Sequence, residues 1–189
     1  MTERRQNHQG VAPPAPNLRR SIIQSAGEAA ALRAIVLDSA ERTADWLRGF
    51  RGSPLDLLTA LRFQTVGHDP MSRKALNIVE QINQTFTILV SLRAVERLIE
   101  MHPGAKGFRL ALGTCSGRDI QSVEPNLVAA EIFSATHPGS NQKLKKDIAR
   151  LKPDTALHRY VFFAAPNYNA GRHANLETEQ GIEVHCVEL

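Results

Sequence analysis

The stretch that decides the fold is residues 107–136, GFRLALGTCSGRDIQSVEPNLVAAEIFSAT. It contains three short apolar runs, at 107–113, 117–123 and 127–136, separated by glycine, proline and asparagine. Apolar residues that alternate, or that form a short run between turn-forming residues, are typical of β-strands. Because the connections are short, we expect the three strands to form one antiparallel meander.

Helical spacing of apolar residues is found on both sides of this meander. A long helix is predicted over 72–101, ended by His102-Pro103-Gly104, and a short amphipathic helix over 140–151. β-branched and aromatic residues then predict strands at 158–164 and 182–187. The change from helical to alternating periodicity indicates an α/β fold.

The composition along the chain predicts three parts. Residues 1–16, with three prolines and few apolar side chains, are expected to be a disordered tail. Residues 17–66 are expected to be an N-terminal helical extension, with an alanine-rich helix over 18–47 and a second helix opened by Ser53-Pro54. The α/β core is expected over 67–189.

Composition and charge narrow the class of protein. A hydrophobic fraction of 42% suits a globular core, and a net charge of +4 allows anionic partners such as nucleic acid without requiring them. The two cysteines and the absence of a secretory signal predict a cytoplasmic, reducing compartment. Because the sequence has no apolar run of roughly 18 residues, we expect no membrane span.

Two carboxylates on neighbouring predicted strands stand out. Glu131 lies inside the apolar run Leu-Val-Ala-Ala-Glu-Ile-Phe, and Asp119 lies early in the preceding strand. If residues 124–126 form a three-residue turn, Asp119 faces Glu131. Directly opposed residues of an antiparallel pair have Cβ atoms roughly 4.5–5.5 Å apart. Two like charges at that distance need a cation between them, or one retained proton.

The two carboxylates are open to two interpretations. A hard cation such as Mg²⁺ or Mn²⁺ takes carboxylate oxygens and can activate a water against a phosphodiester. Alternatively, Glu131 is a solvated position of an edge strand, and Asp119 belongs to a turn and pairs with Arg118.

The predicted order of helix, three-stranded meander, helix and strand over residues 72–164 resembles the core of the PD-(D/E)XK nuclease-like superfamily, a restriction-endonuclease-like αβββαβ fold. That family carries an Asp on its second core strand and a Glu-x-Lys on its third. The resemblance implies that Asp119 and Glu131 hold the metal ion. It also implies a further ligand on the first core helix, where Glu80 fits by position.

The sequence departs from the family motif at two positions, and at the first of them Arg118 precedes Asp119 where the family has a proline. Phe133 stands where the catalytic lysine is expected, so the resemblance moves that role to the following helix, with Lys143 ranked first. Lys145, Lys146 and Arg159 are then expected to contact nucleic acid. The plainer interpretation is that the three lysines form the solvated face of an amphipathic helix.

These features predict a Mg²⁺- or Mn²⁺-dependent nuclease acting on DNA or RNA. The alternative is a catalytically inactive protein of the same fold that binds nucleic acid or serves as an interaction or assembly module. The alanine-rich N-terminal helices are the expected surface for a homodimer or a protein partner.

Overall fold

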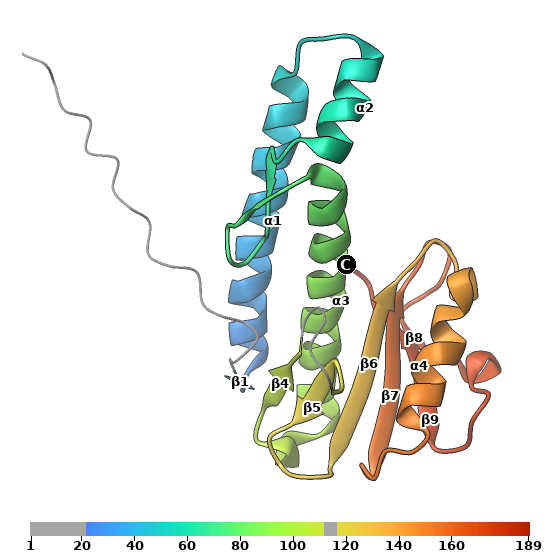
Figure 1. The fold of residues 1–189 in the computed structure, drawn as a ribbon. Helices are drawn as coiled ribbons and strands as arrows, with labels where there is room; N and C mark the ends of the chain where they lie inside the picture. Colours follow the sequence, from blue (N-terminus) through green and yellow to red (C-terminus); the bar gives the residue numbers. More distant parts are fainter. Residues whose placement is uncertain (1–21, 112–116) are drawn as a thin grey trace, which may run out of the picture.

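The computed structural model describes residues 22–111 and 117–189. A mixed sheet of seven strands forms its centre (Figure 1). In spatial order the strands are β1 (Ile22–Ile23), β4 (Phe108–Leu110), β5 (Ile120–Ser122), β6 (Val128–Ser134), β7 (His158–Ala164), β9 (Ile182–Cys186) and β8 (Gly171–Arg172). The α-helices are α1 (Ala26–Gly49), α2 (Pro54–Phe63), α3 (Ile78–Met101) and α4 (Lys143–Leu151). Short 3₁₀ turns cover Pro103–Ala105, Ser140–Gln142 and Ala174–Leu176.

The predicted meander is confirmed, and so is its register. β4 pairs with β5 and β5 with β6, both antiparallel, and Gln121 lies opposite Ala129 as a turn over 124–126 requires. Asn126 adopts a left-handed conformation, which asparagine tolerates at tight turns. The Ser122 hydroxyl donates to the carbonyl of Glu124 and accepts from the amide of Val128, and so holds the register. Residues 112–116, within the predicted strand 107–113 and the loop after it, lie outside the described residues.

The remaining strands of the sheet run parallel to β6. β7 pairs with β6 along its whole length, and β9 pairs with β7. Helix α4 connects β6 to β7, as a crossover between parallel strands requires. The predicted strands 158–164 and 182–187 and the helix 140–151 therefore match the structure to within a few residues.

The long central helix begins later than the sequence predicts. Its first residue is Ile78 rather than residue 72, because Asn77 caps the helix by accepting a hydrogen bond from the Glu80 amide. Residues before it form a separate hairpin of β2 (Gly67–His68) and β3 (Ala75–Leu76). Asp69 turns this hairpin by accepting hydrogen bonds from two backbone amides.

The N-terminal segment also differs from the prediction of one helix over 18–47. Helix α1 begins at Ala26, where the Ser25 side chain accepts from the Glu28 amide. Two residues of β1 precede it and pair with β4. The predicted tail at 1–16 lies outside the described residues. The second helix begins as predicted, with a capping box between Ser53 and Asp56 and proline at its first turn.

Helices cover both faces of the sheet (Figure 1). On one face α3 contacts β6 and β7, and α1 packs along α3, so that Ile23, Ala29 and Val36 join the same hydrophobic cluster as Phe108 and Phe162. On the other face α4 packs on β6 and β7 around Phe133, Ile148 and Phe163. No helix among the described residues is both long enough and apolar enough to cross a membrane.

Helix α2 lies beside α3, away from the sheet, and exposes much of its apolar surface (Figure 1). The side chains of Leu55, Leu58 and Phe63 are 73%, 62% and 78% exposed. The N-terminal helices therefore present an apolar surface in the isolated chain, at the place where the sequence predicts a partner surface.

Candidate functional site

Glu131 lies in the middle of β6 and points toward α4. Its neighbours on the same strand face, Ala129 and Phe133, pack in one hydrophobic cluster with Ile148 and Leu151 of α4. Glu131 is completely buried. Burying a carboxylate there costs free energy unless opposite charge or hydrogen bonds compensate it. Glu131 is therefore the leading candidate for a functional residue.

Asp119 stands opposite Glu131. The observed register pairs Ile120 with Ala130, and the same register carried one residue further places Asp119 across from Glu131, as the sequence predicts. Asp119 Oδ2 accepts a hydrogen bond of 2.9 Å from the Ile132 amide, which ties this side chain to β6. Arg118 pairs with Asp154 and not with Asp119, so the turn pair that the sequence also allowed does not form.

Helix α4 brings three more charged side chains to the same place. Arg150 Nη1 lies 2.7 Å from Glu131 Oε2. Lys143 Nζ lies 2.5 Å from Asp147 Oδ1, one helical turn away, and the Asp147 side chain is buried against the sheet. Three carboxyl groups and two cationic side chains therefore meet between α4 and the strands β5 and β6.

The buried carboxyl oxygens of this cluster lack hydrogen-bond donors. Within residues 22–111 and 117–189, neither Glu131 oxygen accepts a hydrogen bond, and Asp147 Oδ2 accepts none. The Arg150 guanidinium is close to Glu131 but is not aligned as a hydrogen-bond donor. Buried polar atoms in native proteins are nearly always partnered, so the exceptions point to a strained site or to a bound ion or ligand.

The electrostatics of the cluster favour one retained proton. Burial, followed by the negative charge of Asp119, raises the pKa of Glu131 to about 8, and the opposing effect of Arg150 does not overcome them. Burial also raises the pKa of Asp147, although its hydrogen bond with Lys143 acts in the other direction. At neutral pH without a further cation, the Asp119–Glu131 pair therefore carries one negative charge rather than two.

A groove of about 540 Å³ opens beside the cluster, between α3, α4 and the carboxyl end of β6. Its polar and charged lining comes from these three elements, the 3₁₀ turn before α4 and the residue before β5: Asn83, Thr87, Asp119, Ser134, Ser140, Asn141, Lys143, Lys146 and Arg150. In open α/β sheets, ligands bind outside the carboxyl ends of the strands, and this groove has that position.

The structure brings some of the predicted site residues together and separates others. Lys143 and Lys146 line the groove, whereas Lys145 is exposed on α4 outside its lining. Glu80 is exposed in the first turn of α3 and does not line the groove; Asn83 and Thr87 of the same helix do. Arg159, at the start of β7, lines a different pocket and donates to the Lys152 carbonyl.

Sequence reasoning missed Asp147 and Arg150. A signal for Asp147 was present, because it lies within the 3.6-residue spacing of the apolar stripe of Leu144, Ile148 and Leu151 and so had to face the sheet. Arg150 lies off that stripe. Only the length of its side chain lets it reach Glu131, and the sequence pattern does not show this.

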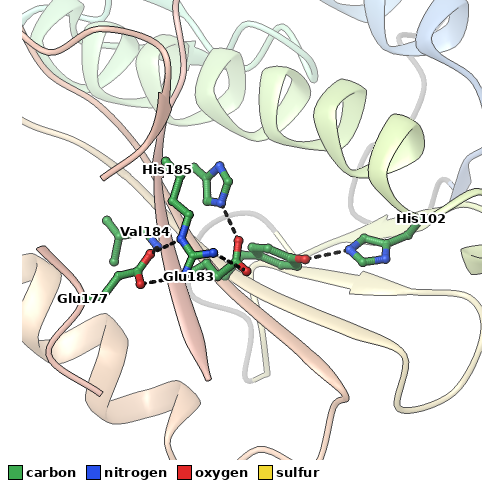
Figure 2. Close-up of polar contacts among 7 residues, drawn as sticks. His102, Glu177, Glu183, Val184 and His185 are labelled. Carbon is green, nitrogen blue, oxygen red and sulfur yellow. Dashed lines mark hydrogen bonds and ion pairs between the residues drawn. The ribbon is translucent and has the colours of Figure 1, made fainter. Parts of the chain in front are cut away.

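A second polar cluster occupies the opposite face of the sheet (Figure 2). Tyr160 of β7 shares a hydrogen bond of 2.8 Å with His102, which follows α3. Burial raises the pKa of Tyr160 to about 12, and burial together with the neighbouring His158 lowers the pKa of His102. Both side chains are therefore neutral at neutral pH and suited to one another as donor and acceptor.

The charged half of this second cluster is fully paired (Figure 2). Arg172 donates to both oxygens of Glu177 at 2.7 and 2.9 Å and to Glu183 at 3.0 Å. Glu183 also contacts the buried His185 at 2.9 Å. Each carboxylate thus has its own cationic or imidazole partner, and the cluster joins β9 to β8 and the segment after it.

Comparisons with protein-family models, curated proteins and solved structures found no match to this chain. Among the described residues, no group of three or more His, Cys, Asp or Glu side chains is arranged to hold one metal ion. A cation at this site would therefore take two carboxylates at most from Asp119 and Glu131 and complete its coordination with water or substrate oxygens, as Mg²⁺ commonly does.

Proposed function

We propose that this protein is a metal-dependent phosphodiesterase that cleaves DNA or RNA in the groove beside α4. The observation that carries the proposal is Glu131, a fully buried carboxylate whose oxygens accept no hydrogen bond within the described residues. It stands opposite Asp119, and Asp119 lines a groove that also contains cationic side chains. Buried carboxylates without donors beside a basic groove are suited to a divalent cation and a phosphate.

The order of elements supports this proposal. Helix α3, the antiparallel meander β4–β5–β6, helix α4 and the parallel strand β7 follow one another as in the nuclease-like fold that the sequence resembles. The two carboxylates lie on the second and third strands of the meander, where that resemblance places the metal ligands. Since fold alone does not establish function, the chemistry of Asp119 and Glu131 is the stronger support for this function.

The residues present fit a hard divalent cation. Asp119 and Glu131 would hold the ion. In the free protein this pair of carboxyl groups retains one proton, which it would lose when the ion binds. A bound Mg²⁺ or Mn²⁺ would supply an activated water and neutralise charge on a phosphodiester. Lys143 and Lys146 line the groove and would bind phosphate oxygens there.

Cleavage assays test the proposal directly. Plasmid DNA, single-stranded DNA and RNA should be cleaved in the presence of Mg²⁺ or Mn²⁺ and not in the presence of a chelator. Glu131→Gln and Asp119→Asn should abolish cleavage, because each removes one of two ligand carboxylates. Glu80→Gln is the matched control, since its carboxylate lies outside the groove, and it should cleave like the wild type. Cleavage that survives in Glu131→Gln would contradict the proposal.

Phe133 favours a second candidate, binding without cleavage. It occupies the motif position of the lysine, is buried, and stacks on Phe163 with ring centroids 5.7 Å apart. In that case the wild type would bind oligonucleotides without cutting them. Fluorescence anisotropy should then show binding that weakens in Lys146→Met and is retained in Glu131→Gln.

A further inference from the structure

Arg150 makes two contacts that join α4 to the strands of the site. Nη1 lies 2.7 Å from Glu131 Oε2, and Nη2 donates a hydrogen bond of 2.9 Å to the Gly117 carbonyl. The Arg150 side chain is 46% exposed, whereas the Glu131 side chain is fully buried. The guanidinium therefore enters the cluster from the groove, and its path back into solvent is open.

Arg150 is the cation closest to Glu131 among the described residues. Lys143 is engaged one turn earlier with Asp147. Lys146 lines the groove without an ion pair in the part of the chain that the structure describes. The positive charge that meets the buried Glu131 comes from Arg150, which lines the groove, whereas Glu131 itself does not line it.

The contact between Arg150 and Glu131 has a geometry that another cation could replace. Strong arginine–carboxylate pairs are bidentate, with two parallel N–H donors. Here one nitrogen is close to one oxygen, and neither Glu131 oxygen receives an aligned hydrogen bond. A released guanidinium would regain hydration in the groove, whereas the carboxylate cannot leave its buried position on β6.

From this geometry we infer that Arg150 is an internal stand-in for the metal ion: it occupies the cation position on Glu131 in the metal-free protein, and a divalent cation displaces it into the groove. The inference rests on the proposed function. A divalent cation on Glu131 would lie within a few Å of the guanidinium and repel it, and the half-exposed Arg150 side chain is the one that can move away. In the groove, the planar fork of Arg150 would face a phosphodiester, whose oxygens it matches. Metal binding would thus make a phosphate-binding residue available.

The test is a Mg²⁺ titration followed by nuclear magnetic resonance of the arginine guanidinium groups. Loss in Arg150→Lys, or in Arg150→Met if the lysine variant is unstable, assigns the Arg150 signals. Without metal, we expect separate Nη–H signals for Arg150, because the two contacts restrict rotation of the guanidinium. Mg²⁺ should abolish these signals with the midpoint that calorimetry gives for binding. Lys145→Met, which removes a charge from α4 outside the groove, should respond like the wild type.

The outcomes separate this inference from the proposed function. Mg²⁺ binding that leaves the Arg150 signals unchanged overturns the inference and not the metal site. Absence of Mg²⁺ binding overturns both. In Glu131→Leu the Arg150 signals should be lost even without metal, because the carboxyl oxygen that Nη1 contacts is gone. Signals that persist in that variant would show that Gly117, and not Glu131, holds the guanidinium, and would also overturn the inference.

Discussion

Each face of the central sheet holds a cluster of ionisable side chains, and the two clusters are built differently. On the α3 face, Arg172, Glu177, Glu183 and His185 contact one another, and each carboxylate has a partner. On the α4 face, Glu131 is more deeply buried than either of those glutamates, yet its oxygens accept no hydrogen bond within the described residues.

This difference separates a structural cluster from a candidate binding site. Paired groups stabilise the fold and leave no capacity for a ligand. A buried carboxyl group whose oxygens accept no hydrogen bond costs stability when it ionises, and a bound cation would remove that cost. The network in Figure 2, with its two histidines and its tyrosine, is more conspicuous, but because its charged groups are paired we assign it a structural role.

Neutralising Glu131 should give the largest change in stability. Its folded-state pKa of about 8 lies above the ordinary value of 4.5, so between these values the folded protein holds a proton that the unfolded chain has lost. Stability contributed by that proton is complete below about pH 4.5 and is lost as pH rises through about 8. In Glu131→Gln this loss disappears, and the variant should be more stable than the wild type at pH 8.

Chemical denaturation at a series of pH values checks this prediction. The wild type should lose at most about 1.4 kcal/mol per pH unit between pH 5 and pH 8 relative to Glu131→Gln. Glu183→Gln is the matched control from the other face, and it should keep the wild-type slope while losing stability, because it removes a partner of Arg172 and His185. Equal slopes in wild type and Glu131→Gln would remove the distinction between the clusters.

Removing a carboxylate from the paired cluster on the α3 face should lower stability, by less than Glu131→Gln raises it. Glu177→Ala removes the bidentate partner of Arg172 and an acceptor for the Val184 amide. We expect a loss of roughly 1–2 kcal/mol, reduced from the full cost of an unpaired charge because Arg172 is half exposed. Urea denaturation measures it. A gain in stability would show that this cluster, too, is strained.

Tyr160→Phe should give the smallest effect. It removes one neutral hydrogen bond, to the half-buried His102, and keeps the ring that packs beside Phe162. A loss of about 0.5–1.5 kcal/mol is expected. Thermal unfolding followed by circular dichroism checks it, with catalytic or binding activity unchanged. Loss of activity in this variant would move the functional site to the α3 face.

The sequence predicted most of the fold because the decisive signals are local. Alternation over 107–136 and the turn at 124–126 were sufficient to predict the meander and its register. The errors lie where a short polar side chain overrides periodicity. Asn77 caps α3 and moves its start from the predicted residue 72 to Ile78. Ser25 caps α1 in the same way, so that Ile22 and Ile23 join the sheet. Two-residue strands leave too short a pattern to recognise.

The candidate site was predicted in part. The strand register placed Asp119 opposite Glu131, and the helix after β6 supplied cationic side chains, as expected. The partner of each cation depends on tertiary packing: Lys143 turns to Asp147 on its own helix, and Arg150 reaches Glu131 across the interface. Which carboxylate each cation contacts depends on side-chain length and on the rotation of α4 about its axis, and the periodicity of the sequence determines neither.

Calorimetric titration with Mn²⁺ tests the central claim most directly. Wild type and Glu183→Gln should each bind one ion per chain, since Asp119 and Glu131 are intact in both. Glu131→Gln should show only the heat of dilution, because the neutral amide removes one of the two ligand carboxylates without changing the shape of the site. Binding that is equal in Glu131→Gln and wild type, or absent from the wild type, would contradict the assignment of this cluster as a cation site.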